Sequence, residues 1–471
     1  LTPHKGCAAS QQHNPILPHI SSLSFRHAAS IKAMKVYIPC IGSRGDHQPF
    51  IALGVELKAR GHEVYLGIHE KYQSMCEGRG FETRILRGNL EDALTQTPEG
   101  RKLQDANLFN AIGRARAVMD PLCRLQFEDM HNHVSEIKPD IIAATTVAGL
   151  IGTRIMEASG AKGCYLNTVP NYPTKYFSPP TMGSYQSMVQ FLNKMKWNLG
   201  IKMFHSMMYK KLLDELHAKF GYEPYPKSFS RGYYDAMELN QYPLLHVYSP
   251  TLLGKPADWP EKARVCGFME LKDSQADAFQ APEDIQKFLD AGEAPIYIGF
   301  GSMLGAFFDD AWRRRFLDTI VKAVEEVAAM EGKGGVRAIV YTVGAGDVPP
   351  SSDRCFLLDR PVPHDWLLPK CRACIIHGGA GTVSACMKAG KPTGVIPFGL
   401  QSDQPFWADI LHFRHVGPKW FGAKHFSLKK FRSMIADLVT KEKYVKNAAA
   451  WRDVYLKEDG VKVVADAIEA L

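Results

Sequence analysis

The sequence predicts an α/β protein made of two doubly wound, Rossmann-like domains that face each other across a cleft. Three observations support this fold class. Short apolar runs alternate with helical stretches from Lys35 to about residue 170, and the same alternation resumes at residue 294. Several strands in both halves end in glycine-containing loops that open a helix. The 471 residues also exceed what one hydrophobic core holds and suit two domains.

Composition and charge set only broad limits on function. With 45% hydrophobic and 23% charged residues, most of the chain should fold. The formal charge of +8 favours anionic partners such as nucleotides, phosphates or acidic lipid surfaces, but it selects none of them. No uninterrupted apolar stretch reaches the roughly 18 residues that a membrane span needs.

The ten cysteines predict a reduced, cytoplasmic setting. Their spacing is irregular, and only Cys371 and Cys374 form a CxxC pattern, which leads into the apolar run "ACIIHGG". Without a second pair at zinc-finger spacing, we interpret them as buried thiols rather than a metal or redox site.

Residues 1–32 are predicted to be a disordered leader. They contain no Asp or Glu and many Ser, His and Pro residues. A transit peptide has a similar composition, but Arg26 is the only arginine in this segment.

The first domain is predicted over residues 33–248. "KVYIPC" (35–40) is a strand, "QPFIALGVELKARG" (48–61) a helix with Phe50, Leu53 and Leu57 on one face, and "HEVYLGI" (62–68) a second strand. Later strands of the same parallel sheet are expected at 139–149 and 163–170. The alternation stops between about 171 and 245.

The second domain is predicted over residues 270–445, after a linker at 249–269 that holds three prolines and two glycines. The sequence predicts strands in 294–303, 337–344, 372–378 and 391–398, a helix at about 309–330 and another from Gln404. The C-terminal residues 446–471 are expected to be helical and to pack back on the first domain.

A phosphate site is predicted in the second domain at "IIHGGAGT" (375–382). There a buried strand ends in a glycine turn before a helix, whose free N–H groups and positive dipole end favour an anion. The next strand ends near Asp403 and Gln404 on the same sheet edge, where a carboxylate and an amide suit sugar hydroxyls. Asp403 could also cap the helix that follows.

Five segments together resemble one known family. They are "GSRGDHQPF", "GFGSM", "VPHDWLLPKC", "HGGAGT" and "PFGLQSDQPFWA", and in this order and spacing they resemble the UDP-sugar-dependent sterol glucosyltransferases of fungi and plants. The resemblance covers about residues 34–440. These enzymes have the GT-B fold, two Rossmann-like domains facing across a cleft, which is therefore the fold that the resemblance implies.

The resemblance also implies a donor site for UDP-glucose or a related UDP-hexose. Ser43, Arg44 and Ser302 would contact the donor, and Val362, His364 and Trp366 would hold the uracil. His377, Gly379, Ala380, Gly381 and Thr382 would take the diphosphate, and Asp403 and Gln404 the sugar. Core packing is the alternative role for Trp366.

Asp46 is the candidate general base. In plant relatives with the pattern G-H-x-x-P, a histidine stands where this chain has Asp46, three residues before Pro49. An acid there could take the proton of an acceptor hydroxyl in a single, inverting displacement. The alternatives are that Asp46 caps the following helix, or that His47 is the base or orients Asp46.

No metal or other cofactor is expected beyond the UDP-sugar. A D-x-D pattern, with which the other large glycosyltransferase fold holds its metal, occurs nowhere in the chain. Charge on the leaving UDP would then be stabilised by the glycine turn and helix N-terminus alone.

The acceptor is predicted to be a sterol or another terpenoid alcohol. Residues 158–213 contain no Asp or Glu but many Met, aromatic and Lys residues. We expect an apolar acceptor pocket with a basic outer face that contacts a membrane, although such residues at helical spacing also form cores. The residues proposed to line this pocket are Met182, Met188, Phe191, Met195 and Phe204.

Other functions remain open from the sequence. They are glycosylation of a soluble secondary metabolite and a non-catalytic nucleotide-sugar-binding module. A dehydrogenase is disfavoured because the first strand is followed by G-S-R-G rather than G-x-G-x-x-G. No nucleic-acid partner is expected.

Overall fold

The computed structural model describes residues 32–104, 110–182, 190–271, 279–301, 304, 309–330, 335–399 and 402–471. The predicted leader lies outside the described residues except for Lys32, and the second unit of the chain, Ala33–Leu471, contains both β-sheets. Three predicted site residues are affected by the bounds of the described ranges: Ser302 and Met188 lie outside the described residues, and so does the side chain of Phe191.

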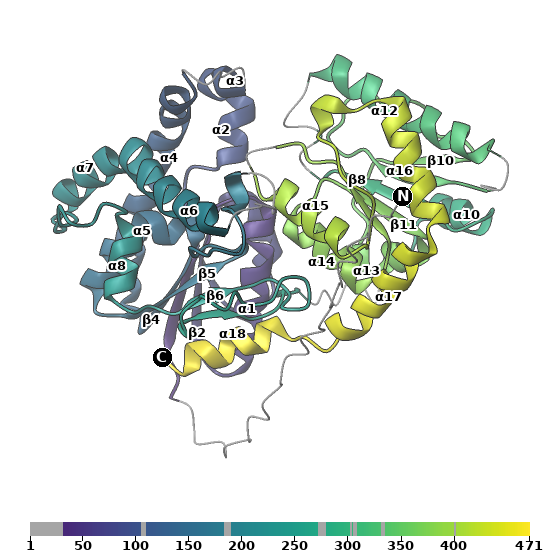
Figure 1. Ribbon diagram of the computed structural model, residues 1–471. Coiled ribbons are helices and arrows are strands. Elements are labelled where there is room, and N and C mark those ends of the chain that lie inside the picture. Colours follow the sequence, from purple (N-terminus) through teal and green to yellow (C-terminus); the bar gives the residue numbers. More distant parts are fainter. Residues whose placement is uncertain are drawn as a thin grey trace, which may run out of the picture. The chain divides into compact units, whose positions relative to one another are not determined.

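The first half of the second unit contains a seven-stranded sheet in which all neighbouring strands are parallel (Figure 1). The strand order is β3-β2-β1-β4-β5-β6-β7. The strands are β1 Lys35–Pro39, β2 Glu63–Ile68, β3 Glu82–Ile85, β4 Ile141–Thr145, β5 Lys162–Asn167, β6 Leu244–His246 and β7 Ala263–Val265. The order changes direction between β1 and β4, and open α/β sheets bind ligands beside the carboxyl ends of such strands.

The second half contains a five-stranded parallel sheet of the same kind, in the order β10-β9-β8-β11-β12. Its strands are β8 Ile296–Gly299, β9 Ala338–Tyr341, β10 Cys355–Leu358, β11 Ala373–Ile376 and β12 Thr393–Val395. Here the order changes direction between β8 and β11, so the loops after these two strands lie at the ligand-binding edge.

Helices connect the strands in both halves (Figure 1). Those of the first half are α1 Gln48–Ala59, α2 Leu90–Gln96, α3 Pro98–Gln104, α4 Ala111–Ile137, α5 Thr146–Ser159, α6 Gln190–Phe204, α7 Lys210–Phe220 and α8 Tyr233–Leu239. Those of the second half are α10 Glu283–Asp290, α12 Asp310–Ala328, α13 His364–Leu367, α14 Ala380–Lys388, α15 Gln404–Phe413 and α16 Leu428–Thr440. The chain ends in α17 Glu442–Tyr455 and α18 Gly460–Glu469.

Each sheet is covered on both faces, which explains why its strands read as continuous apolar runs. In β1, Val36 and Ile38 pack with residues of α1 and α18, while Tyr37 between them packs with α4 and α5. In the second sheet, Ile296 and Ile298 pack with α12 and α16, and Tyr297 faces the cluster that includes α14 and α15. Successive side chains of a strand point to opposite faces of the sheet, so neighbouring residues pack against different layers of helices.

The C-terminal helices pass from one half to the other. Tyr455 at the end of α17 shares a hydrogen bond with Ser384 of α14. Helix α18 lies against α1 of the first half, where Arg60 bonds Asp466 at 2.6 Å and Glu469 at 2.8 Å. The chain packs closely at the start of α18, because a β-carbon on Gly460 would collide with the carbonyl oxygens of Gly267 and Phe268.

Two predicted boundaries differ from the structure. The predicted strand at 139–149 ends at Thr145, and helix α5 begins at the next residue, since the apolar sequence there fits a buried helix as well as a strand. The predicted linker at 249–269 contains β7, which pairs with β6 and extends the first sheet to residue 265. The sequence analysis did not identify strands β3, β6, β7 and β10, each three or four residues long.

Within the described part of the chain, no helix combines the length and the apolar character that crossing a membrane requires.

Candidate active site

The loop after β1 holds the Asp46 carboxylate in a fixed position. Asp46 Oδ2 accepts hydrogen bonds from the backbone N–H of Ser43 at 2.9 Å and from its hydroxyl at 3.0 Å. Gly42 has a φ of +141°, and a β-carbon there would overlap the Asp46 carboxyl group. The loop therefore needs glycine at 42 to bring its own backbone against the acid.

Burial raises the pKa of Asp46 above its ordinary value, while hydrogen bonds from Ser43 and Thr168 act in the opposite direction. A carboxylate that is more basic than usual is a better proton acceptor. The cap alternative is not observed, because the side chain of Asp46 bonds back to Ser43, and α1 begins after His47 without a side-chain cap.

His47 supports this loop from inside the protein. It is fully buried, and its ring lies 4.4 Å from that of Tyr72. Nδ1 donates to the Ser43 carbonyl at 2.8 Å, and Nε2 accepts from the backbone N–H of His69 at 3.4 Å. Burial lowers its pKa to about 4, so the ring is neutral at pH 7. Because both ring nitrogens are engaged inside the protein, neither is available to an acceptor hydroxyl.

His377 stands at the corresponding edge of the second sheet, directly after β11. The turn beyond it requires glycine, since Gly378 has a φ of +95° and a β-carbon there would meet Val395 at 2.8 Å. Nδ1 of His377 is buried and has no hydrogen-bond partner among the described residues. Burial lowers the pKa of His377 to about 4, with a further contribution from His364. A buried imidazole nitrogen without a protein partner at this edge of the sheet is able to bond a ligand there.

The N-terminus of α14 adds backbone donors beside His377. Gly379 is the N-cap and has no side chain to bond the first amides. The N–H groups of Thr382 and Val383 bond to the Gly379 carbonyl, so the free donors of the first turn are those of Ala380 and Gly381. A β-carbon on Gly381 would meet nothing within 4 Å, so the space beside this turn is open. A diphosphate fits such a site.

Asp403 and Gln404 begin α15 at the end of the next strand. Asp403 occupies the N-cap position, but its Oδ2 accepts from the indole N–H of Trp407 at 2.9 Å instead of capping the backbone. The side-chain amide oxygen of Gln404 accepts from the backbone N–H of Phe398 at 2.8 Å and from that of Gly399 at 3.2 Å. Trp407 and Phe398 therefore fix the two polar groups that the sequence assigns to the sugar.

The two strand-edge sites come close to each other. The pKa of Asp403 is raised to about 6, mainly by burial and in smaller part by the charge of Asp46, while the hydrogen bond from Trp407 acts to lower it. Burial raises the pKa of Tyr341 and lowers that of His364 in the second half, and the charge of Arg44, in the same loop as Asp46, acts to lower both. Charged groups of the loop after β1 thus act on residues of the second half that the sequence assigns to the donor.

The segment assigned to the uracil is anchored through α13. His364 Nε2 bonds the Tyr297 hydroxyl at 3.1 Å, and Lys370 lies 4.3 Å from the Trp366 ring centroid. Trp366 and Val362 are half-buried and pack against the core, so Trp366 contributes to packing and still presents a surface.

The described residues assigned to the acceptor do not form an enclosed pocket. The side chains of Met182, Met195 and Phe204 are 54%, 47% and 50% exposed. They are exposed because α6 turns a different face inward, through Asn193 and Trp197. Met182, Met195 and Phe204 lie on the surface of the first half.

Two contributors escaped the sequence analysis. Thr168, which bonds Asp46, follows strand β5, and Trp407, which bonds Asp403, reads as a core residue of α15. Thr168 could have been found, because it is a polar residue at the end of a strand. Trp407 could not, because no pattern in the sequence separates it from its apolar neighbours.

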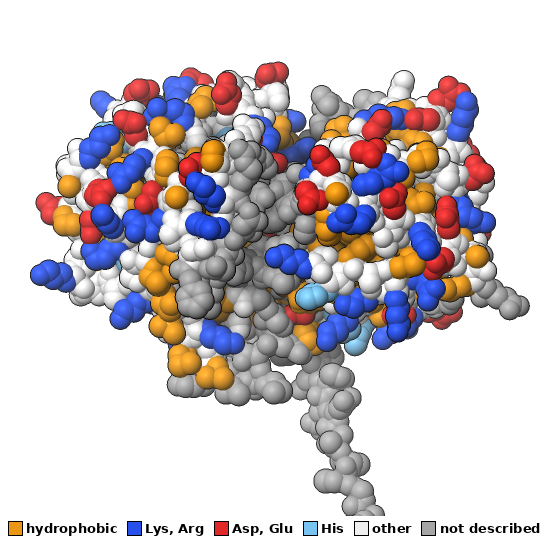
Figure 2. All heavy atoms as spheres, turned by 90° about the horizontal axis from the view of Figure 1, so that it is seen from above, with side chains coloured by type: hydrophobic (Ala, Val, Ile, Leu, Met, Phe, Trp, Pro, Cys, Tyr) orange, Lys and Arg blue, Asp and Glu red, His pale blue; other side chains and the backbone are white. Residues whose placement is uncertain are grey.

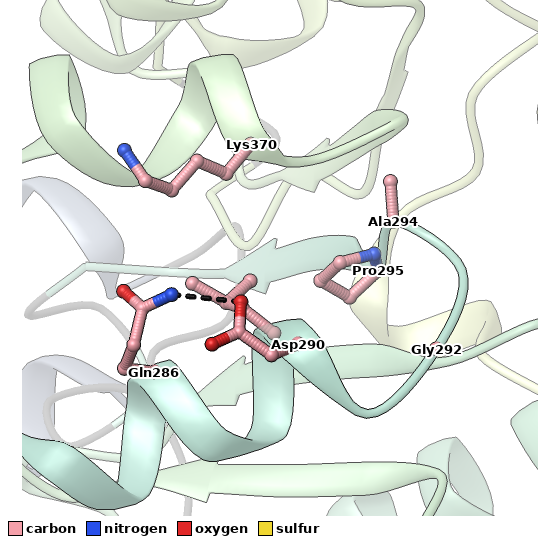
Figure 3. Close-up of a pocket in the computed structure, with 7 residues that line it drawn as sticks. Gln286, Asp290, Gly292, Ala294, Pro295 and Lys370 are labelled. Atoms are coloured by element: carbon pink, nitrogen blue, oxygen red, sulfur yellow. Dashed lines mark hydrogen bonds between the residues drawn. The ribbon is translucent and has the colours of Figure 1, made fainter.

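A shallow pocket of about 290 Å³ lies elsewhere, between α10 and the start of β8 (Figure 3). Gln286 and Asp290 of α10 are joined by a 2.8 Å hydrogen bond, and Lys370 lies across from them. Pro295 precedes β8, so this pocket opens at the amino ends of the strands, opposite the edge that carries His377. We do not assign the donor to it.

Comparison with known proteins agrees with this arrangement. Residues 36–178 match the glycosyltransferase family 28 N-terminal domain. Sterol 3-beta-glucosyltransferase UGT80A2 of Arabidopsis thaliana is 29% identical over 460 residues, covering 93% of this chain and 65% of that protein. The sterol 3-beta-glucosyltransferase of Saccharomyces cerevisiae is 28% identical over 468 residues, covering 94% and 36%. The chain therefore spans just under two thirds of the plant relative and about a third of the yeast one.

Solved structures share the fold. The calicheamicin glycosyltransferase CalG4 superposes with a TM-score of 0.65 at 14% identity, covering 93% of this chain and 98% of that one. The glycosyltransferase VinC, solved in complex with DTDP, gives 0.58 at 17% identity, covering 93% and 100%. The GT-B fold and the resemblance to sterol glucosyltransferases are both confirmed.

Proposed function

We propose that the protein is a UDP-glucose-dependent sterol glucosyltransferase, which moves glucose to the hydroxyl of a sterol or related terpenoid alcohol with inversion of configuration. One observation carries the proposal: the Asp46 carboxylate lies close enough to Asp403 for its charge to raise the pKa of that residue. In this proposal Asp46 is the proton acceptor, and it acts near Asp403 of the other half, which would bind the sugar. The relatives named as sterol 3-beta-glucosyltransferases support glucose and sterol as substrates.

In this proposal the reaction is a single displacement. Asp46 takes the proton of the acceptor hydroxyl, and the hydroxyl oxygen forms a bond to the anomeric carbon of the sugar as the bond from that carbon to UDP breaks. Negative charge gathers on the leaving diphosphate. The free N–H groups of Ala380 and Gly381 and the imidazole of His377 stabilise this charge, which lowers the barrier.

The remaining donor contacts follow from position. Val362, His364 and Trp366 would hold the uracil, with Ser302 completing the loop after β8. Arg44 reaches toward His364 and Tyr341 from the other half and would meet the donor there. Asp403 and the amide nitrogen of Gln404 would bond the glucose hydroxyls.

The proposed setting is the cytoplasm, at a membrane surface where a sterol lies. The nine cysteines of the described residues are all free and buried, which suits a reducing compartment. Contact with a membrane belongs to the proposal because the acceptor is a lipid.

A chelator is expected to leave activity within about twofold of the untreated enzyme. Among the described residues, no group of three or more His, Cys, Asp and Glu side chains could hold a metal ion. The proposed stabilisation of UDP uses the α14 N-terminus and His377 instead. Initial rates with and without EDTA provide the measurement. Complete loss that manganese or magnesium restores would contradict the proposal.

Incubation with UDP-glucose and a panel of sterols, terpenoids and soluble phenols, with products read by mass, tests the function. We expect a gain of one hexose on sterols. Transfer only to soluble alcohols would favour the secondary-metabolite alternative, and binding of UDP-glucose without any transfer would favour a non-catalytic module.

A further inference from the structure

Helix α6 buries one side and exposes another that is also apolar. On the buried side, Asn193 donates to the Lys175 carbonyl at 2.9 Å and accepts from the Ser178 hydroxyl at 3.0 Å. Trp197, one turn further, donates its indole N–H to the Phe177 carbonyl at 2.9 Å. These bonds fix the rotation of α6 about its axis, so the exposure of its other side is built into the fold.

The outer side carries a row of large apolar side chains. They are spaced by three, four and four residues, which places them on one helical stripe. The row consists of Leu192, Met195, Leu199 and Met203, with exposures of 37%, 47%, 53% and 47%. Met207, in the turn of π-helix that continues α6 (His205–Tyr209), is 42% exposed. Burial within the chain therefore does not account for this row.

Two lysines flank the row. Lys196 and Lys202 are exposed and lie on either side of it by helical spacing, and no ion pair joins them to a described residue. The nearest acidic residues along the chain are Glu157 and Asp214, outside the acid-free segment. In the space-filling view, hydrophobic side chains gather at the lower left, on the side of the first half where α6 faces the viewer in Figure 1 (Figures 1 and 2).

This face is connected to the sugar-binding residues. A β-carbon on Gly200 of α6 would collide with the Met182 side chain, so the short helix η3 (Pro180–Met182) packs directly on α6. Five residues earlier, the ring of Phe177 lies 5.4 Å from that of Phe406 in α15, the helix that begins at Gln404. A lipid held at the outer face of α6 would thus lie next to the segment that borders the donor site.

We propose that the outer face of α6 docks on a bilayer surface that contains anionic lipids. The apolar row would enter the boundary between headgroups and acyl chains, and the lysines would meet the lipid phosphates and carboxylates. An acid-free, lysine-flanked face complements an anionic surface, whereas a second copy of the chain would bring lysines against lysines. The inference deepens the proposed function, because it rests on a sterol acceptor that lies in the bilayer.

Sedimentation with vesicles tests the docking face directly. The full chain should sediment with phosphatidylcholine vesicles that contain phosphatidylserine, less with phosphatidylcholine alone, and less as salt increases. Replacing Leu192, Leu199 and Met203 with Ser, or Lys196 and Lys202 with Gln, should lower binding on the order of 10- to 100-fold. Val445→Ser/Val454→Ser on α17, whose side chains are 52% and 47% exposed, is the matched control and should bind as the unaltered chain does.

Unchanged vesicle binding in both α6 variants would overturn the proposal, and so would a fall from dimer to monomer in the serine variant by analytical ultracentrifugation. Glucosylation of a detergent-dispersed sterol separates the proposal from the function. The α6 variants should keep that activity while losing activity on vesicle-embedded sterol; equal losses would overturn docking. Vesicle binding that responds as predicted, in a protein that transfers no glucose in either format, supports the docking face and refutes the function.

Discussion

Replacing Asp46 with Asn is expected to slow turnover by about 10² or more, because a positioned general base contributes roughly 10²–10⁴. Asparagine can still accept the Ser43 hydrogen bonds that hold the loop, so folding and donor affinity should stay close to those of the unaltered protein. Initial rates with UDP-glucose and a sterol, together with UDP affinity by calorimetry, provide the measurement.

His47 supplies the comparison for this variant. Its ring is buried and neutral, with both nitrogens engaged inside the protein, so His47→Gln should act through the stability of the loop. We expect a lower melting temperature and a modest loss of turnover. If His47→Gln abolishes turnover in a folded protein while Asp46→Asn is mild, then the base is His47 and the assignment of Asp46 is wrong.

The pH dependence of activity tests the same assignment of Asp46 as the general base. The base works only as a carboxylate, so activity should fall as pH drops through the pKa of Asp46. Because burial raises that pKa, the fall should begin at higher pH than for an ordinary aspartate. The activity of the Asp46→Asn variant should no longer show this fall at low pH. If Asp46 had a purely structural role, the fall would remain in the variant.

Replacing His377 with Ala is expected to weaken UDP binding roughly tenfold to hundredfold. A hydrogen bond to a charged group contributes about 1.5–3 kcal/mol, and Nδ1 of His377 is buried without a partner among the described residues. The pKa of about 4 makes the ring neutral at pH 7, so the bond would come from an N–H donor rather than from a full positive charge. Calorimetric titration with UDP measures the effect.

Two variants make this prediction specific. His377→Gln keeps an N–H donor of similar reach and should lose less affinity than His377→Ala. His425→Ala, at an exposed histidine of the same half, should bind UDP as the unaltered protein does. Equal UDP affinity in all of these variants would refute the phosphate role of His377.

The turns of both sites could be predicted from the sequence because their chemistry is local. Gly42 and Gly378 have backbone angles that favour glycine, and each follows a buried strand at a point where strand order reverses. A glycine turn after an apolar run is visible without knowledge of the fold, and parallel strands bring such turns to one edge.

Contacts between distant segments could not be predicted in this way. Thr168 reaches Asp46 from the end of another strand, and Trp407 bonds Asp403 from inside a helix that reads as core. The sequence also could not show which side of the methionine-rich helix faces outward. Helical spacing places Met195 and Leu199 on one stripe, but only the bonds of Asn193 and Trp197 decide that this stripe faces outward.

The configuration of the product formed from UDP-α-glucose and a sterol tests the central claim most directly. We predict a β-glucoside, seen in the coupling constant of the anomeric proton, because one displacement by a hydroxyl activated at Asp46 inverts the anomeric carbon. The Asp46→Asn variant should give the same product at a rate lower by about 10² or more. An α-glucoside would mean that two successive displacements occur at the anomeric carbon. That result would contradict a direct attack by the acceptor hydroxyl.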